Sequence, residues 1–311
     1  MTMVKTPLMI NGATHSAQSF RLMIRDLARN SEGITAGGDF KVGALAVPGA
    51  QVQVGDGSCI IRGRANIWQG HYDAYNIGIT NVPIAPTGST ARSDMVCVRV
   101  LDPEYEGGRN PATDATVEFQ VASNVGAAAT TPPAGWTAIP LARIDMPAGT
   151  SVITQAMITD LRSLANPRRD RKLMPIVGFP YDPINKSSGG GFKDWPAAAR
   201  WQINIPAWAT TANMMTTVAG LRLSGGNVFG DMRHVLGGSA GAAAQIDDDG
   251  GSGWRRANHI VVDVLTVPAA MRGTTQLLRL QTAIYEPDPG TVDTNAATAA
   301  ILDIEFVEGL L

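Results

Sequence analysis

Short segments in which apolar and polar residues alternate constrain the fold of this sequence more than any other feature. The segment 299–309, AAILDIEFVEG, places an apolar residue at every second position from Ala300 to Phe306. Successive side chains of a β-strand point to opposite faces, so this pattern predicts a strand with one buried face. Strands do not alternate with long helical patterns, which disfavours a parallel doubly wound sheet. The chain is therefore predicted to be mainly β.

Candidate strands occupy both halves of the chain, and glycine, proline, asparagine and serine separate them. The N-terminal candidates are 39–47, 50–65, 75–82, 94–102, 116–123 and 136–146. The C-terminal candidates are 200–206, 217–225, 227–237, 259–268, 275–287 and 299–309. The first set predicts a β-rich module with one short helix. The second predicts an antiparallel, jelly-roll-like β-sandwich.

The one clear helical pattern covers Ser16 to Asn30, with Ser16 as the expected N-cap. Three apolar residues recur at helical spacing and are expected to form the buried face: Phe20, Ile24 and Leu27. Three arginines fall on another face at i, i+4 and i+8: Arg21, Arg25 and Arg29. This arginine face is expected to be solvated, or alternatively to dock on an acidic neighbour.

A length of 311 residues indicates two domains of ordinary size. Residues 1–165 are predicted to form an assembly module and 197–311 the β-sandwich, an interaction or receptor-binding domain. The segment 166–196 between them lacks periodicity and is rich first in basic residues, then in glycine, proline and serine. It is predicted to be a linker.

The composition limits the kinds of partner. A net charge of −2 with 17% charged residues gives no global field that would attract DNA or an anionic membrane, so neither nucleic-acid binding nor membrane insertion is predicted. The N-terminal apolar run is too short for a signal peptide, which predicts synthesis in a cytoplasm. Cys59 and Cys97 form no disulfide framework and are expected to be small core residues.

A basic cluster, RRDRK, opens the predicted linker. It is too short, in a slightly acidic chain, for a nucleic-acid footprint. Arg168, Arg169 and Arg171 are instead predicted to lie at an inter-domain joint and to bind carboxylates on an adjacent subunit. The alternative is a linker that only aids solubility.

The segment GGSAG at 237–241 matches the nucleophile-elbow pattern G-x-S-x-G, with Ser239 as the nucleophile. Asp247 and His259 follow in the order that a serine hydrolase could use. However, the elbow requires a strand-to-helix turn above a parallel sheet, and the surrounding pattern is all-β. A flexible turn is favoured, no enzyme or cofactor is predicted, and a cell-wall hydrolase is kept as a third hypothesis.

Two further features of the C-terminal half are candidate binding sites. Asp247, Asp248 and Asp249 form a weak candidate for a cation such as Ca²⁺, with a solvated turn as the favoured alternative. Trp254 follows a glycine-rich stretch and precedes Arg255 and Arg256. An aromatic residue on a loop beside arginines can stack on a sugar ring or anchor a partner protein. The alternative is an indole folded back over its own strand.

The order of segments in the first half carries a resemblance to a known family. PLMINGATHSAQSFRLMIRDL at 7–27 is followed by the hairpin-like GDFKVGALAVPGAQVQVGDGSCIIRG at 38–63. The most specific pieces are the closing segment from Ala156 to Arg162 and the R-x-D-x-V motif from Arg92 to Val96. This half resembles the N-terminal module of minor tail and upper-baseplate proteins of long-tailed, siphovirus-type phages that infect actinobacteria.

The resemblance implies a virion structural protein in the tail tip, assembled in the host cytoplasm as a ring or homotrimer with other tail and baseplate proteins. In that family the C-terminal half varies and often carries a head that binds carbohydrate or a receptor. No collagen-like or coiled-coil shaft separates the halves here, which favours a compact baseplate component over a fibre. The alternative function is a receptor-binding protein whose sandwich recognises host-surface glycan.

Overall fold

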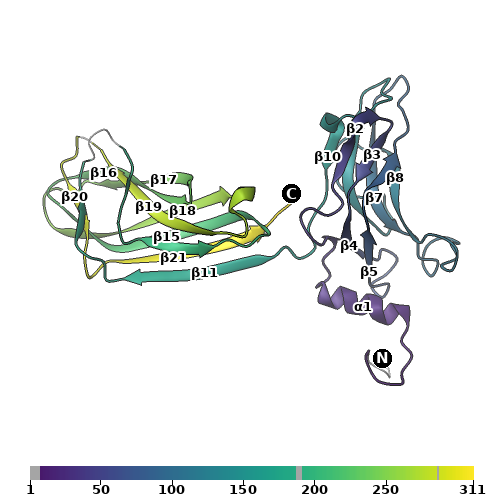
Figure 1. Cartoon of the computed structure of the whole chain (residues 1–311), viewed down its shortest axis with the longest axis horizontal. Helices are drawn as coiled ribbons and strands as arrows, with labels where there is room; N and C mark the ends of the chain where they lie inside the picture. The colour runs from purple at the N-terminus through teal and green to yellow at the C-terminus, as the bar shows by residue number, and fades with distance from the viewer. Residues whose placement is uncertain (1–7, 187–190, 286) are drawn as a thin grey trace. The chain divides into compact units, whose positions relative to one another are not determined.

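The computed structural model describes residues 8–186, 191–285 and 287–311, and these form two compact units (Figure 1). The first unit ends at Pro167 and also includes Leu310–Leu311, while the second covers Arg168–Gly309. The unit boundary lies within a few residues of the position predicted from the sequence. No helix in the described ranges is long and apolar enough to cross a bilayer.

The first unit contains three antiparallel sheets. One has the order β1 (Gly33–Ile34), β4 (Gly57–Arg62), β5 (His71–Asn76). The second has the order β2 (Val42–Gly49), β3 (Gln51–Val54), β6 (Thr80–Pro83). The third has the order β10 (Ile158–Asp160), β9 (Ala138–Met146), β7 (Arg92–Val100), β8 (Val117–Val125), and the short 3-10 helix η1 (Gln155–Met157) precedes β10.

Apolar side chains from all three sheets form the main core of this unit, with Ile61, Val52 and Leu141 as examples. Cys59 lies in that core and Cys97 in a smaller cluster, and both are free thiols with no exposed surface, as the sequence predicted. Burial raises the pKa of both thiols, that of Cys97 to about 12. Both therefore stay protonated and inert at neutral pH.

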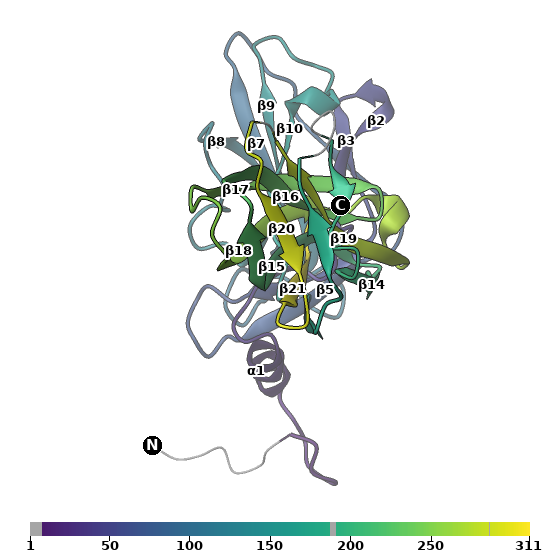
Figure 2. The same ribbon diagram turned by 90° about the vertical axis from the view of Figure 1, so that its left-hand side faces the viewer.

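Helix α1 (Ala17–Leu27) crosses the ends of β4 and β5 in Figure 1 and is seen end-on in Figure 2. Ser16 caps it as predicted, because its hydroxyl accepts a hydrogen bond from the Ser19 amide. The favoured orientation, with the arginine face solvated, is wrong, and the alternative, docking on acidic residues, is confirmed for Arg21. Arg21 is the buried residue of the helix, whereas Phe20 is 45% exposed and Leu27 75%.

The partners of Arg21 explain this reversal. Its guanidinium pairs with Asp102 at 3.2 Å and with Glu104 at 2.7 Å. It also lies over the rings of Tyr72 and Tyr105. A buried cation is tolerated when it is paired and hydrogen-bonded. Asp102, Glu104 and Tyr105 lie about eighty residues from Arg21 in the sequence.

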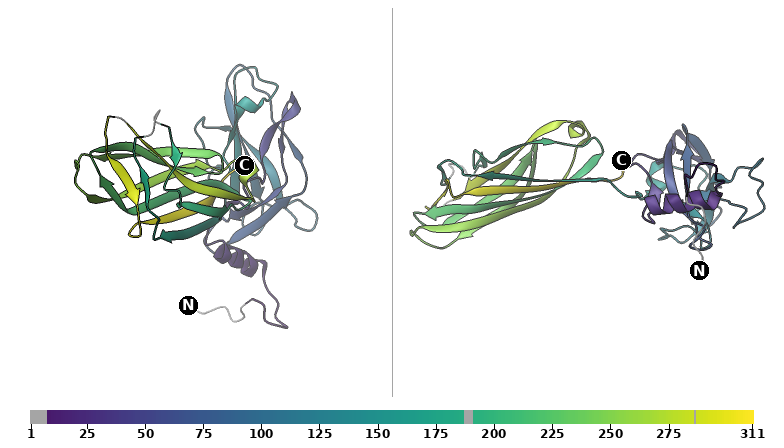
Figure 3. Two further views of the ribbon diagram at one scale, coloured as in Figure 1. Left: turned by 60° about the vertical axis from the view of Figure 1, so that its left-hand side comes forward. Right: turned by 90° about the horizontal axis from the view of Figure 1, so that it is seen from below.

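The second unit contains two antiparallel sheets, which Figure 3 shows from two further sides. The long strands of the first have the order β11 (Arg169–Val177), β21 (Ala299–Glu308), β15 (Ala209–Ser224), β18 (Arg255–Thr266). Those of the second have the order β14 (Arg200–Asn204), β19 (Thr275–Ile284), β16 (Val228–Leu236), β17 (Ser239–Asp248). Short elements complete the unit: β12 (Asp182–Ile184), β20 (Thr291–Thr294), β13 (Lys193–Asp194) and η2 (Ala269–Met271).

Numbered along the chain, the eight long strands have the orders 1-8-3-6 and 2-7-4-5 in the two sheets. This is the connectivity of a jelly roll, in which two Greek keys wind together. The predicted fold class, a β-rich module with one short helix followed by a jelly-roll-like sandwich, is confirmed.

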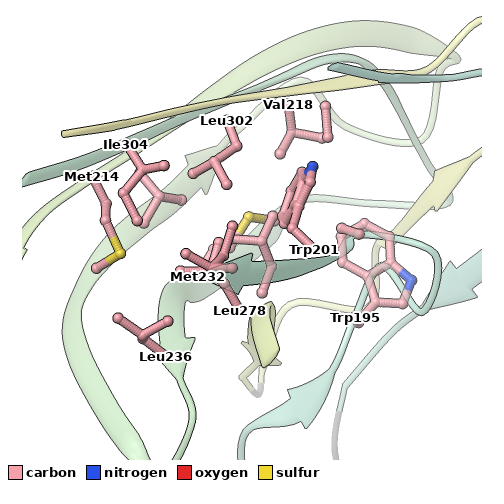
Figure 4. Close-up of a cluster of buried hydrophobic side chains, with 14 of the residues drawn as sticks. Trp195, Trp201, Met214, Val218, Met232, Leu236, Leu278, Leu302 and Ile304 are labelled. Carbon is pink, nitrogen blue, oxygen red and sulfur yellow. The ribbon is translucent and has the colours of Figure 1, made fainter. Parts of the chain in front are cut away.

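The inward faces of the two sheets meet in one apolar core (Figure 4). The first sheet contributes Met214, Val218, Leu302 and Ile304. The second contributes Trp201, Met232, Leu236 and Leu278. The Trp201 indole also donates a hydrogen bond to the Met174 carbonyl, which fixes β11 over this core. Each fully buried aliphatic side chain contributes about 1.5–3 kcal/mol to stability, so this apolar core is the main stabilising feature of the unit.

The predicted linker 166–196 is wrong over most of its length. Arg169–Val177 forms β11 and pairs with β21 along its full extent, and β12 and β13 also fall within the segment. Residues 187–190 lie outside the described residues. The strand pattern was hidden because Asp170 and Lys172 occupy inward-facing positions, and Pro175 also lies within the strand. Proline is tolerated here because β11 is an edge strand.

Candidate functional site

The outer face of the sheet β11-β21-β15-β18 is unusually apolar; we call it the outer sheet face. Alternate residues of β15 and β18 point into the core, as Met214 and Val261 do, and their neighbours point outward. Seven large apolar side chains of these strands are more than a third exposed: Leu173, Val177, Met215, Ile260, Val262, Val264 and Ile301. These seven residues lie outside the closed core of the unit.

The strand register brings these side chains together. Val262 lies opposite Met215, and Ile260 and Ile301 flank Thr217 from both sides. A shallow hollow of about 250 Å³ lies beside Met215 and Val262. Contiguous exposed apolar patches of this kind are uncommon on monomeric proteins and mark sites of association.

Arg169 and Arg171 of the predicted arginine cluster lie on this same face, together with Asp303 and Glu305 of β21. Arg169 pairs with Glu305 at 3.4 Å, and Arg171 pairs with Asp303. Hydrogen bonds from Arg171 hold the pKa of the Asp303 carboxyl below its usual value. The interpretation of Arg169 and Arg171 as part of a joint is wrong, because both lie inside a strand.

Arg168 lies at the boundary itself. Its Nε donates to Glu308 at 2.9 Å, and its guanidinium lies 5.3 Å from the centre of the Trp208 ring. All three arginines thus bind carboxylates of β21 in their own chain. Their contact with an adjacent subunit stays a prediction.

A second candidate site is a cluster of Tyr181, Arg222 and Trp254, which we call the aromatic cluster. Trp254 is 71% exposed and Tyr181 65%. The Arg222 guanidinium lies 3.7 Å from the centre of the Trp254 ring and 5.8 Å from that of Tyr181. Its Nε donates to the buried Asp293 carboxylate at 2.7 Å. The cation therefore holds the indole in place while much of the indole surface stays open to solvent.

The two arginines that follow Trp254 have structural partners. Arg255 pairs with Asp248 and donates to the carbonyls of Gly251 and Gly226, at 2.6 and 3.0 Å, and so closes the β17–β18 connection. Arg256 donates to the Gly220 carbonyl at 2.6 Å. Of the three residues predicted for this loop, the structure places only Trp254 in the aromatic cluster.

Sequence reasoning missed Tyr181 and Arg222. They come from segments about 70 and 30 residues before Trp254, and only the sheet pairing brings them near it. An exposed tryptophan beside glycines was the one available signal. Nothing in the local sequence indicates which arginine stacks on it.

The weak candidate for a cation site, Asp247 to Asp249, is not supported by the structure. Asp247 and Asp248 are successive residues of β17, so their side chains point to opposite faces. Asp248 is taken by Arg255, and Asp249 accepts a hydrogen bond from the Asn227 amide at 3.2 Å. Among the described residues, no group of three or more histidine, cysteine, aspartate or glutamate side chains is placed to hold a metal ion.

The G-x-S-x-G match is a hairpin and not a nucleophile elbow. Leu236 pairs with Ser239 across the two-residue turn Gly237–Gly238, and Gly237 has a φ of 57°. Such turns join adjacent antiparallel strands. His259 lies on β18 opposite Val218, in the other sheet. The strand-to-helix geometry that a hydrolase of this type requires is therefore not present at Ser239.

Comparison of the sequence with protein-family models and with curated proteins finds no match. Among solved structures, the VP2 subviral particle of infectious bursal disease virus is 10% identical over 92% of this chain and 86% of that chain, with a TM-score of 0.28. T=1 particles derived from infectious bursal virus give 10% identity, coverages of 93% and 80%, and a TM-score of 0.29. The insecticidal delta-endotoxin Cry8Ea1 of Bacillus thuringiensis is 8% identical over 89% of this chain and 52% of that chain, with a TM-score of 0.18. With TM-scores below 0.5, these likenesses carry no argument, and the fold assignment rests on the strand order.

Proposed function

We propose that this protein is a virion structural protein of the phage tail tip or baseplate, and that copies of it associate through the outer sheet face. One observation carries the self-association: seven exposed apolar side chains gather on one sheet of a unit whose core is already complete. The tail-tip location rests on the resemblance of the N-terminal half to minor tail and upper-baseplate proteins. The function needs no catalysis, because buried apolar area provides the free energy of assembly.

The dimensions of the face favour a second copy as its occupant. Four strands at about 4.8 Å spacing, paired over roughly ten residues of about 3.3 Å each, span roughly 600 Å² in projection. Standard interfaces bury about 800 Å² on each partner, which a pleated face of this size can reach. The ion pairs of Arg169 with Glu305 and of Arg171 with Asp303 place charged groups on β11 and β21 of this face, where they can fix the register of a partner.

Sedimentation of the full chain tests the self-association. We expect an assembly larger than the 32.7 kDa monomer, and three copies if the resemblance holds. Val262→Lys should shift it to 32.7 kDa, because a buried unpaired ammonium opposes association. Ile77→Lys is the matched control, since Ile77 is 88% exposed in the first unit. A wild-type protein that stays monomeric at high micromolar concentration would contradict self-association.

Labelling of intact virions tests the location. Antibodies against the chain should mark the tail tip in electron micrographs. Label on the capsid would contradict the tail-tip assignment, and a chain missing from purified particles would contradict the virion role altogether.

The aromatic cluster favours a second candidate function, recognition of host-surface glycan. An exposed indole held by a cation offers a flat apolar surface on which a sugar ring can stack. Trp254→Ala should then reduce binding of the protein to host cell walls at least tenfold. Trp68→Ala, which removes a 58% exposed tryptophan of the first unit, is the control. Equal loss in both variants, or no wall binding by the wild type, would count against this function.

A further inference from the structure

A hollow of about 530 Å³ lies in the first unit, lined by residues of α1, of the β4–β5 loop and of the adjoining ends of β4 and β5. Three guanidinium groups line it, those of Arg25, Arg62 and Arg64, together with the imidazole of His71. The sequence gives no hint of this grouping, since Arg25 is distant from the other three residues. Neither self-association nor glycan recognition uses it.

The strand register explains why these groups converge. Arg62 and His71 are directly opposite each other in the β4–β5 pair, so their side chains share one face of the sheet. The Gly63 amide donates to the Gly70 carbonyl at 2.9 Å and closes the loop that carries Arg64. Arg25, in the last turn of α1, donates to the Ile67 carbonyl in the same loop.

The hollow has more positive than negative charge. Glu32 pairs with Arg64 at 2.8 Å and with Arg62 at 3.9 Å. Arg25 pairs with Asp26, whose side chain is 67% exposed. Three guanidinium groups therefore face two carboxylates. Arg62 has the longest ion pair of the set and a side chain that is 45% exposed, so it can reach a ligand.

The buried imidazole of His71 also indicates that the hollow binds a ligand. Its side chain lines the hollow, and the residue is 1% exposed. Neither ring nitrogen makes a hydrogen bond of good geometry within the described chain, although the Asn30 and Gly70 carbonyls lie near the ring. Burial lowers the pKa of His71 and keeps the imidazole neutral, with one N–H to donate. Because these carbonyls are poorly placed for hydrogen bonding, an anion in the hollow could compete with them for that N–H.

We propose that this hollow binds an oxyanion, a carboxylate or phosphate group, with Arg62 and Arg64 as the main donors and the His71 N–H as a further one. Planar guanidinium groups match the oxygen pairs of such anions. The partial negative charge at the end of α1 opposes an anion, and Arg25 in the last helical turn offsets it. The ligand is thus defined by an anionic group with at least two oxygens.

Calorimetric titration of the full chain with inorganic phosphate and, separately, with acetate tests this site. Sodium chloride at matched ionic strength is the reference. We expect saturable binding of at least one anion with a Kd of about 1 mM, typical of a small group with few contacts. Arg62→Gln should weaken it about tenfold or more, because a hydrogen bond to a charged group is lost. Arg109→Gln is the control, since Arg109 pairs with Glu118 in the same unit and does not line the hollow.

The two anions separate the possible sources of the ligand. Saturation with phosphate alone indicates a phosphate group, whereas saturation with acetate indicates a carboxylate. No saturable signal above chloride for either anion would overturn the proposal, as would equal affinity in the wild type and Arg62→Gln. Circular dichroism spectra identical to the wild type ensure that Arg62→Gln is folded, and Arg64→Gln provides a second variant.

Discussion

The two units use arginine in opposite ways. In the first, the Arg162 side chain has no exposed surface and that of Arg21 is 8% exposed. In the second, the side chains of Arg169 and Arg171 are 63% and 66% exposed. Three small sheets leave polar gaps that a guanidinium can fill, whereas two broad sheets close an apolar core without one. The most deeply buried arginines therefore lie in the first unit, and the most exposed of these four lie on β11 of the second.

Arg162 shows how a guanidinium substitutes for packing. It pairs with Asp160 at 2.8 Å and donates to the carbonyls of Asp39, Gly37 and Leu311, at 2.7, 3.3 and 3.2 Å. These carbonyls belong to segments far apart in the sequence. One side chain therefore joins the closing strand of the first unit to the loop before β2 and to the C-terminal residue.

The largest effect is expected from Arg162→Ala. The substitution leaves three carbonyls and a carboxylate without their donor, and we expect a loss of about 3 kcal/mol in the free energy of unfolding. Urea denaturation of the full chain measures it. A loss below about 1 kcal/mol would mean that the buried guanidinium is not what stabilises the first unit.

We expect low pH to destabilise the second unit by a similar amount. His234 is fully buried with Thr216 as its partner at 2.8 Å, and burial lowers its pKa from 6.5 to about 4. Between pH 6.5 and about 4 the unfolded chain binds a proton that the folded one does not, so stability falls as the pH falls. The expected loss across this window is about 3 kcal/mol.

The variant His234→Gln isolates this contribution, because glutamine does not titrate. Burial also lowers the pKa of His71 and His259, which therefore act in the same direction in both proteins. We expect a flatter dependence of the unfolding free energy on pH in the variant than in the wild type. Parallel curves from pH 7 to 4 would show that His234 is not the acid-sensitive group.

A smaller effect is expected from Arg168→Ala, which leaves the Glu308 carboxylate, 3% exposed, without its guanidinium partner. We expect a loss of about 2 kcal/mol in unfolding free energy. Thermal unfolding, with the shift compared to that of Arg171→Ala, measures it. If the two variants unfold at the same temperature, burial of the Glu308 carboxylate does not determine the loss of stability.

Arg171→Ala should change stability least. Its guanidinium is two-thirds exposed, and exposed ion pairs contribute about 0–1 kcal/mol. Added salt should remove even that difference from the wild type. A loss above about 2 kcal/mol would contradict the contrast between inner and outer arginines.

The period-two pattern was sufficient to predict the sandwich, because β15, β16, β19 and β21 alternate clearly between buried and exposed positions. It failed at β11, where charged residues occupy inward positions. The face of α1 was predicted wrongly because the partners of Arg21 are distant in sequence. Local patterns report local burial; they do not report which distant side chain neutralises a charge.

The same limit applies to the candidate sites. Trp254 was found because a tryptophan beside glycines is conspicuous, but its stacking partner Arg222 depends on strand pairing. The hollow lined by Arg62 and His71 depends on the β4–β5 register, which no composition or motif reveals. Sites assembled across strands were therefore beyond sequence reasoning.

The two buried thiols have a practical consequence. Cys59 and Cys97 are the only cysteines of the chain, and neither has exposed surface in the folded protein. A cysteine introduced at Val262 would thus be the one thiol that a reagent or a second thiol can reach. Chemical cross-linking through that position could therefore test whether two copies meet at the outer sheet face without first removing the native cysteines.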